Sequence, residues 1–193
     1  VLDAVIYDGH ITKNDSIIIG GLEVPIIAQV KTLFSVTNHK LNSVNEVDAA
    51  ANIFISLNTS DEKNIFAGMP FLVASDDIEN QKIDIQKEVE EVLVQVDNEG
   101  VVVKADSLGS LEALISLLGE HDIKIRKTSI GDISKKDLAE AASDNNPINK
   151  VILAFNIKEL DRLSDVKVFN HDVIYKIVDE YKEWYMKEKV RLQ

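Results

Sequence analysis

Hydrophobic and polar residues follow two different patterns along the chain. Up to about residue 75, short β-branched runs are separated by turn residues, which is typical of strands. We expect strands at residues 1–7, 16–19, 26–33, 52–57 and 70–74. Several short strands without a convincing helix predict a small closed β-barrel, which we assign to residues 1–78. The pair Asp8-Gly9 predicts a hairpin turn, because glycine adopts a positive φ freely and aspartate tolerates it.

Residues 79–97 have a different texture, rich in charged and amide side chains with apolar residues at helical spacing. We interpret this segment as a linker that becomes a helix or a docking strand near its end. Residues 100–105 then have the composition of a strand buried on both faces. The leucine-rich stripe at 108–118 has the period of a helix, and Gly119 is a plausible end for it.

Strands and helices continue to alternate over residues 98–171. We expect strands at 123–130, 151–155 and 166–169, with a helix near 135–143 and a short one before the last strand. Ser134 and Asp137 have the spacing of a capping box at the start of the first of these helices. Such alternation predicts a mostly parallel sheet in a three-layer α/β/α sandwich. Residues 172–193 continue as the start of a long C-terminal helix, whose apolar stripe ends near Met186.

Composition narrows the class of protein. The chain has 193 residues, a net charge of −12 and no cysteine, which excludes thiol catalysis, disulfides and cysteine-ligated zinc. No apolar run approaches the roughly 20 residues that span a bilayer, and a secretory signal pattern is missing. We therefore expect a cytoplasmic protein with no membrane partner. Because the chain starts at Val1 and ends within a helical pattern, we also expect it to be the middle of a longer protein.

The acidic charge is distributed unevenly. Residues 1–95 contain 6 basic and 15 acidic side chains, whereas residues 24–45 contain no acidic one. Global acidity argues against coating of bare nucleic acid, but it leaves room for a local contact. An alternative is that these lysines are solvated charges or guards of edge strands. Our candidate ribosome or RNA contacts are Lys31, His39, Lys40, Lys124, Arg126, Lys127, Lys135 and Lys136.

The sequence nominates no catalytic, cofactor-binding or metal-binding residue. A phosphate-binding loop of the Gly-x-x-x-x-Gly-Lys-Ser/Thr type is missing, and the four histidines are widely separated. Residues 106–110 join a strand to a helix, where open α/β sheets bind ligands and helix amides attract anions. The structural interpretation, which we favour, is that Ser107 caps the helix and Gly109 allows close helix–sheet packing.

Several stretches resemble one known family. LDAVIYDG at 2–9 and KNDSIIIGG at 13–21 resemble the second domain of the translation initiation factor GTPases, called initiation factor two in bacteria and initiation factor five B in archaea and eukaryotes. GVVVKADSLGSLEAL at 100–114 resembles their third domain, followed in order by IGDISKKDL at 130–138, ILAFN at 152–156 and VIYKIVDEY at 173–181. Within that family, the amino-acid sequence resembles the archaeal and eukaryotic branch most closely.

The resemblance implies a β-barrel, an α/β/α domain and the start of a helix that leads to a barrel for initiator tRNA. It implies a non-catalytic part of a GTPase, with GTP and Mg in a domain outside this chain. The implied partners are the rRNA of the small ribosomal subunit, the large subunit during joining, and initiator tRNA through a further domain. One departure is that residues 35–45 replace a longer basic loop and contain no arginine.

Two other hypotheses remain at this point. The chain could be a freestanding ribosome- or RNA-associated module that is unrelated to a GTPase. It could also be an enzyme that uses the crevice at residues 106–110.

Overall fold

The computed structural model describes residues 1–37, 40–93, 97–158 and 166–191. The chain forms two compact units. Unit 1 comprises Val1–Ile65 and Met69–Val89, and unit 2 comprises Phe66–Gly68 and Glu90–Gln193.

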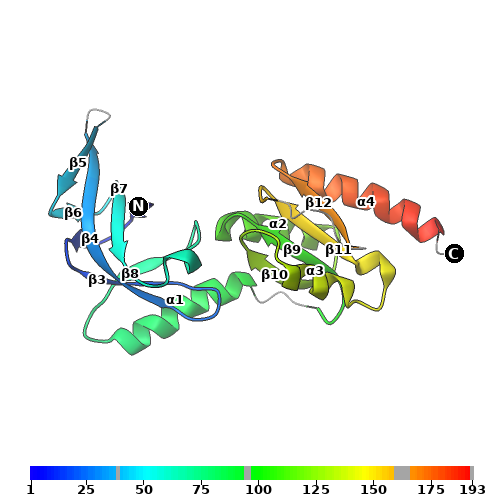
Figure 1. The fold of residues 1–193 in the computed structure, drawn as a ribbon, viewed down its shortest axis with the longest axis horizontal. Coiled ribbons are helices and arrows are strands. Elements are labelled where there is room, and N and C mark those ends of the chain that lie inside the picture. The colour runs from blue at the N-terminus through cyan, green and yellow to red at the C-terminus, as the bar shows by residue number, and fades with distance from the viewer. Residues whose placement is uncertain (38–39, 94–96, 159–165, 192–193) are drawn as a thin grey trace. The chain divides into compact units, whose positions relative to one another are not determined.

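Unit 1 is built around a curled antiparallel sheet (Figure 1). The strand order is β1 (Leu2–Ile6), β7 (Ala51–Asn58), β4 (Ile26–Thr37), β3 (Ser16–Ile19) and β8 (Phe71–Val73), with β5 (Lys40–Val44) paired to β4. The short strands β2 (His10–Thr12) and β6 (Glu46–Asp48) form a separate pair, and η1 (Glu62–Asn64) is a single 3₁₀ turn. Within the described residues β1 and β8 end the strand order without pairing to each other, so a closed barrel is not seen.

The core of unit 1 lies on the concave side of this sheet. Ile17, Ile19, Leu33, Ile53 and Ile55 are all buried there, because alternate residues of each strand point to the same face. The helix α1 (Ile78–Leu93) buries Ile85 and Val89. The segment that we interpreted as a linker is thus helical from residue 78 and not only near its end.

The hairpin prediction at Asp8-Gly9 is wrong. Gly9 does have a positive φ of 77°, but β1 pairs with β7 and β2 pairs with β6. A favourable turn allows a hairpin without requiring it. The β7 partner of β1 contributes two buried residues, Ile53 and Ile55, to the core of unit 1.

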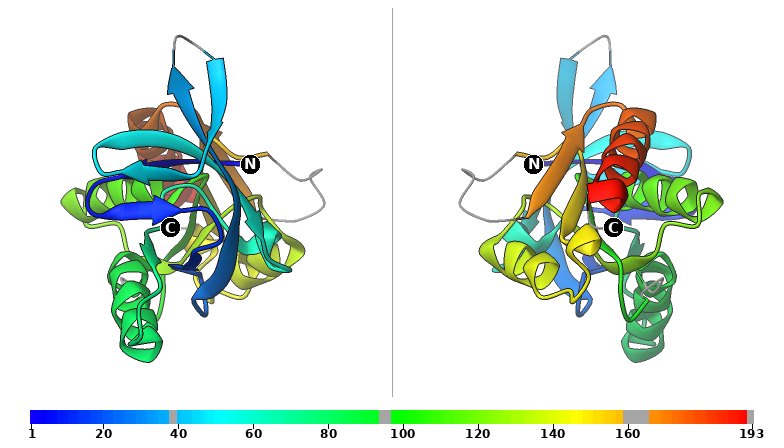
Figure 2. Two further views of the ribbon diagram at one scale, coloured as in Figure 1. Left: turned by 90° about the vertical axis from the view of Figure 1, so that its left-hand side faces the viewer. Right: turned by 90° about the vertical axis from the view of Figure 1, so that its right-hand side faces the viewer.

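Unit 2 is a three-layer arrangement around a parallel sheet. The strand order is β10 (Ile125–Ile130), β9 (Val101–Ala105), β11 (Val151–Phe155) and β12 (Lys167–His171). The helices α2 (Leu108–Glu120) and α4 (Ile174–Arg191) contact each other on one face, and α3 (Lys135–Ala142) covers the other, as Figure 2 shows. The turn η2 (Pro147–Asn149) precedes β11. The short helix expected before β12 falls largely on residues 159–165, which lie outside the described residues.

The last helix, α4, is anchored on unit 2 as far as Trp184, whose ring centroid lies 5.9 Å from that of Phe169. Ile177, Val178 and Tyr181 are buried, and the Tyr181 ring packs edge-on against Phe169 with 6.0 Å between ring centroids. Farther along, Met186 and Val190 are 68% and 75% exposed, so the helix extends into solvent as the sequence predicts. Within the described residues no helix combines the length and apolarity needed to cross a membrane.

Candidate nucleic-acid interface

The hairpin of β4 and β5 projects beyond the rest of its sheet in unit 1 (Figures 1 and 2). Lys31 is exposed at a bulge in β4, where the pairing with β7 skips from Val30 to Thr32. Lys40 is exposed at the start of β5, and His39 lies outside the described residues. Val36 and Leu41 are cross-strand partners that are 49% and 58% exposed. The hairpin therefore presents cationic and apolar groups and no acidic ones.

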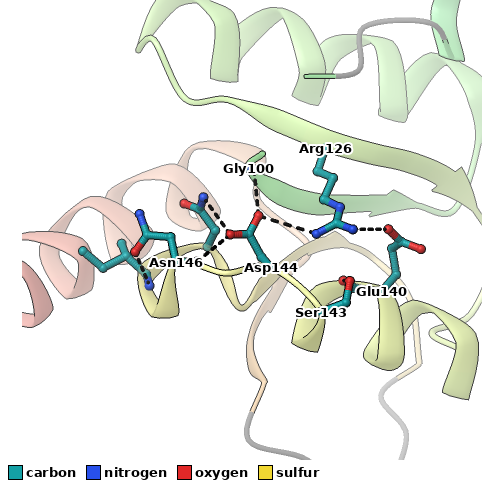
Figure 3. Close-up of polar contacts among 8 residues, drawn as sticks. Gly100, Arg126, Glu140, Ser143, Asp144 and Asn146 are labelled. Carbon is teal, nitrogen blue, oxygen red and sulfur yellow. Dashed lines mark hydrogen bonds and ion pairs between the residues drawn. The ribbon is translucent and has the colours of Figure 1, made fainter. Parts of the chain in front are cut away.

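In unit 2, two of the predicted RNA contacts are already engaged within the protein. The Lys124 ammonium lies 2.6 Å from the Glu99 carboxylate, and this hydrogen bond and charge raise the pKa of Lys124. Arg126 occupies a bulge in β10 and forms ion pairs of 3.1 Å with Glu140 and 3.7 Å with Asp144 (Figure 3). Both cations therefore have carboxylate partners within the chain, the Lys124–Glu99 pair being exposed, and their contact with RNA stays a prediction.

Asp144 is the centre of this structural network (Figure 3). Its buried carboxylate accepts hydrogen bonds from the backbone N–H of Gly100 at 3.2 Å and of Asn146 at 2.8 Å. Burial by itself raises the pKa of Asp144, but these hydrogen bonds and the Arg126 charge outweigh it and hold the pKa below its usual value. Gly100 has a φ of 142°, and a Cβ there would clash with the Lys124 carbonyl, so only glycine fits.

Three predicted cations of unit 2 form no ion pair with any described residue. Lys127 is half-buried on β10 and lines a cavity of about 330 Å³. Lys135 and Lys136 are exposed side by side in the first turn of α3. Cations are unfavourable at a helix N-terminus because of the helix dipole, so helix stability does not explain these two lysines.

Two backbone N–H groups of the alternative ligand site at residues 106–110 already donate within the protein. The Ser107 hydroxyl accepts a hydrogen bond from the Ser110 N–H, and the Leu108 N–H donates to the Ala67 carbonyl at 3.0 Å. The helix-cap interpretation of Ser107 is confirmed. The packing role of Gly109 is wrong, because a Cβ at Gly109 would meet nothing within 4 Å.

A buried ion pair in unit 2 was missed by sequence reasoning. The Lys104 ammonium on β9 lies 2.8 Å from the Asp137 carboxylate on α3, and both side chains are buried. The Ser134 N–H and hydroxyl donate to the same carboxylate, which completes the predicted capping box. Burial raises the pKa of Asp137, but the hydrogen bonds from Lys104 and Ser134 outweigh it, so the pKa is lowered. The available signal was a lysine within a strand predicted to be buried on both faces.

Comparison with known proteins decides the family. The family model described as Translation-initiation factor 2 matches residues 74–182. The chain belongs to the translation-initiation factor 2 family. The match confirms the resemblance to the initiation factor GTPases that we inferred from the sequence stretches, and the archaeal relatives described next agree with it.

Other initiation factors match this chain over almost its whole length. It is 39% identical to a probable translation initiation factor IF-2 of Methanocaldococcus jannaschii, covering 100% of this chain and 18% of that protein. It is 40% identical to the corresponding protein of Methanococcus aeolicus, covering 95% of this chain and 33% of that protein. The crystal structure of GDP-bound aIF5B from Aeropyrum pernix matches with a TM-score of 0.80 and 36% identity, over 97% of this chain and 34% of that one. The chain thus spans about a third or less of these relatives.

Proposed function

We propose that this chain is the central, non-catalytic part of a cytoplasmic translation initiation factor GTPase and that it docks on the rRNA of the small ribosomal subunit. The observation that carries the proposal is the β4–β5 hairpin, an exposed basic ribbon without acidic residues in a chain of the translation-initiation factor 2 family. In this proposal GTP and Mg bind in another domain of the parent protein. The large subunit during joining and initiator tRNA are partners of the parent factor.

The hairpin suits an RNA surface in two ways. Lys31 and Lys40 can each neutralise a phosphate, and this releases condensed counterions. Val36 and Leu41 offer apolar contact to sugars or exposed bases, which acidic side chains would oppose. Among the predicted contacts of unit 2, Lys127, Lys135 and Lys136 form no ion pair with a described residue, which suits them to a second contact.

The helix α4 fits the role of a relay to the tRNA-binding end. Its 18 residues reach about 27 Å at ~1.5 Å per residue, and Met186 and Val190 in its last part are exposed. A small rotation of unit 2 would therefore be amplified at the far end of the helix.

Sedimentation with purified small subunits at low and at physiological salt tests the docking. Reversal of Lys31, Lys40, Lys127 and Lys136 to glutamate is expected to weaken binding at least about tenfold and to flatten its salt dependence. A matched control reverses Lys13, Lys63, Lys176 and Lys189, four exposed lysines that are likewise split equally between the units. Equal loss in both variants, or no loss in either, would overturn the contact assignment.

Calorimetry with GTP and Mg tests the non-catalytic part of the proposal. The 193-residue chain is expected to bind no nucleotide at micromolar concentration, since it has no phosphate-binding loop. Micromolar GTP affinity would refute this. The freestanding-module alternative is decided by the gene sequence upstream of Val1, where a phosphate-binding loop would identify the GTPase parent.

A further inference from the structure

The outer face of the unit 1 sheet carries a pair of phenylalanines on adjacent strands. Phe34 of β4 and Phe54 of β7 are direct cross-strand partners, and such partners have Cβ atoms roughly 4.5–5.5 Å apart. The residues beside them in sequence, Leu33, Ile53 and Ile55, are buried in the core, so both phenylalanines point to the opposite side of the sheet. They are half-buried there. Two aromatic side chains thus adjoin on a face that is turned to solvent.

Further apolar side chains continue this face toward the tip of the β4–β5 hairpin. Val36 lies two residues beyond Phe34 and pairs with Leu41, and both are exposed. On the other side, Val5 of β1 is 46% exposed. Apolar area that is exposed in this way and bordered by polar side chains marks an interaction site. We call this surface the phenylalanine face, which consists of Val5, Phe34, Val36, Leu41 and Phe54.

Polar side chains border the phenylalanine pair. The cross-strand row that contains the pair ends in Asp3 on β1 and Ser43 on β5. The next row, away from the hairpin tip, consists of Thr32 and Ser56, and Lys31 is exposed beside it at the bulge of β4. The sequences of β4 and β5 contain no acidic residue. Hydroxyl groups and an ammonium therefore lie next to the rings, and a carboxylate lies on the β1 side.

These surroundings match the groups of an unpaired nucleotide. A base can stack on each ring, the hydroxyls can bond to base edges or to a ribose 2′-OH, and Lys31 can pair with a phosphate. The Asp3 carboxylate can accept a hydrogen bond from the exocyclic amino group of a base, and it directs phosphates toward the lysine side. An apolar protein segment would cover the rings but would leave the Lys31 ammonium without a partner of opposite charge.

We propose that the phenylalanine face binds unpaired RNA nucleotides by stacking their bases on Phe34 and Phe54. RNA-binding modules built on a four-stranded sheet stack two or three bases on aromatic side chains of that sheet. Here β7 and β4 carry the rings and lie between β1 and β5. Base pairs inside a duplex are stacked on each other, so the ligand is a single strand or a loop. The inference rests on the proposed rRNA docking and deepens it, because it names the structural class of RNA that this face recognises.

The probe for the test is a dodecamer RNA of alternating A and C, used as a single strand or annealed to its complement. Fluorescence anisotropy of the labelled RNA measures its affinity for the 193-residue chain, and amide NMR locates the contact. We expect the single strand to bind more tightly than the duplex and to shift the amides of residues 32–36, 41–43 and 52–56.

The variant Phe34→Leu/Phe54→Leu keeps apolar side chains on the sheet but removes both rings. It should weaken binding of the single strand at least about tenfold, because stacking on each ring is lost. The salt dependence of binding should keep its wild-type slope, since no cation is removed. The control Tyr175→Leu removes an exposed ring from α4 in unit 2 and should bind the single strand as the wild type does. A thermal melt verifies that each variant is folded.

Several results would overturn the proposal. They are undetectable binding of the single strand, wild-type affinity in the phenylalanine variant, equal weakening in the control, and duplex binding as tight as that of the single strand. Amide shifts confined to other residues of the wild type would overturn it without any variant. Sedimentation equilibrium that shows a dimer abolished by the phenylalanine variant would assign the face to a protein partner instead.

The result is separable from the rRNA docking. If the lysine reversals abolish binding to small subunits while the phenylalanine variant binds both subunits and single strand as the wild type does, only the stacking is refuted. If the single strand binds through the rings but small subunits do not bind, the phenylalanine face is supported and the docking is refuted.

Discussion

Replacement of Lys104 by methionine is expected to destabilise unit 2 strongly. The substitution removes the ammonium but leaves the Asp137 carboxylate buried, with only the two hydrogen bonds from Ser134. Removing one partner of a buried ion pair typically destabilises by about 3–5 kcal/mol, since the remaining charge lacks compensation. Because Ser134 still solvates Asp137 in part, we expect about 3 kcal/mol.

The pH dependence gives a sharper signature. In the wild type the pKa of Asp137 is lowered, so the pair stabilises the fold above the unfolded pKa of about 3.9 and this is lost as the pH falls through the folded value. In Lys104→Met the burial of Asp137 is no longer opposed by the lysine, so its folded pKa moves upward. The variant then gains stability relative to the wild type as the pH is lowered. The difference between the two proteins should therefore shrink from pH 7 toward pH 4.

Urea unfolding followed by tryptophan fluorescence measures this difference. The chain has one tryptophan, Trp184 on α4, so the signal reports unit 2. The double variant Lys104→Met/Asp137→Asn should be more stable than Lys104→Met, because a neutral amide costs less to bury than a carboxylate. A loss below about 1 kcal/mol at pH 7, or a difference that does not change with pH, would refute the reasoning.

Three further predictions use the same fluorescence assay or a simple titration. Gly100→Ala should lower the free energy of unfolding by about 3 kcal/mol, because Gly100 has a φ of 142° and a Cβ there would clash with the Lys124 carbonyl. Gly109→Ala should raise the free energy of unfolding by about 0.5 kcal/mol, because alanine favours the helix and meets nothing there. Similar effects at both positions would contradict this geometry. Asp144→Ala leaves two backbone amides without their acceptor, removes one of the two carboxylate partners of Arg126, and should lose about 2–3 kcal/mol. The deficit should fade below pH 4 because the wild-type pKa of Asp144 is lowered, and an unshifted urea midpoint would argue against this role. Burial raises the pKa of Tyr181 to about 12, so the folded protein should retain one phenol that does not ionise at pH 11, and it should lose stability as the pH rises above about 10. The substitution Tyr181→Phe should remove the late step in the absorbance at 295 nm. A single transition near pH 10 for all tyrosines of the folded chain would show that the Tyr181 ring is accessible.

Elements buried on one or both faces were predictable from the sequence, because burial imposes a pattern. The strands β9 and β11 and the leucine stripe of α2 follow from their apolar content, and all are buried. β5 could not be predicted, since it is exposed along almost its whole length and has no alternation to detect. Its pairing depends on the neighbouring strand β4, which continues past Leu33 and offers a free edge.

The functional assignment of single cations was less predictable. A lysine or arginine in a sequence has the same appearance whether its partner is a phosphate or a carboxylate of the same chain. Arg126 looked like part of a basic cluster, but the parallel sheet and the turn after α3 bring Asp144 and Glu140 to it. Lys104 was hidden for the same reason, because its partner lies 33 residues away in sequence.

The placement of charge, and not its total, is what bears on docking. A net charge of −12 would repel RNA from every side if it were spread evenly. The acidic side chains instead lie outside the β4–β5 hairpin, since residues 24–45 contain none. If the hairpin contacts rRNA as proposed, repulsion by the acidic remainder of unit 1 disfavours orientations that would turn other faces of that unit toward phosphates. Specificity would then come from the disfavoured contacts as much as from the favoured ones, which is how charged interfaces select a single arrangement.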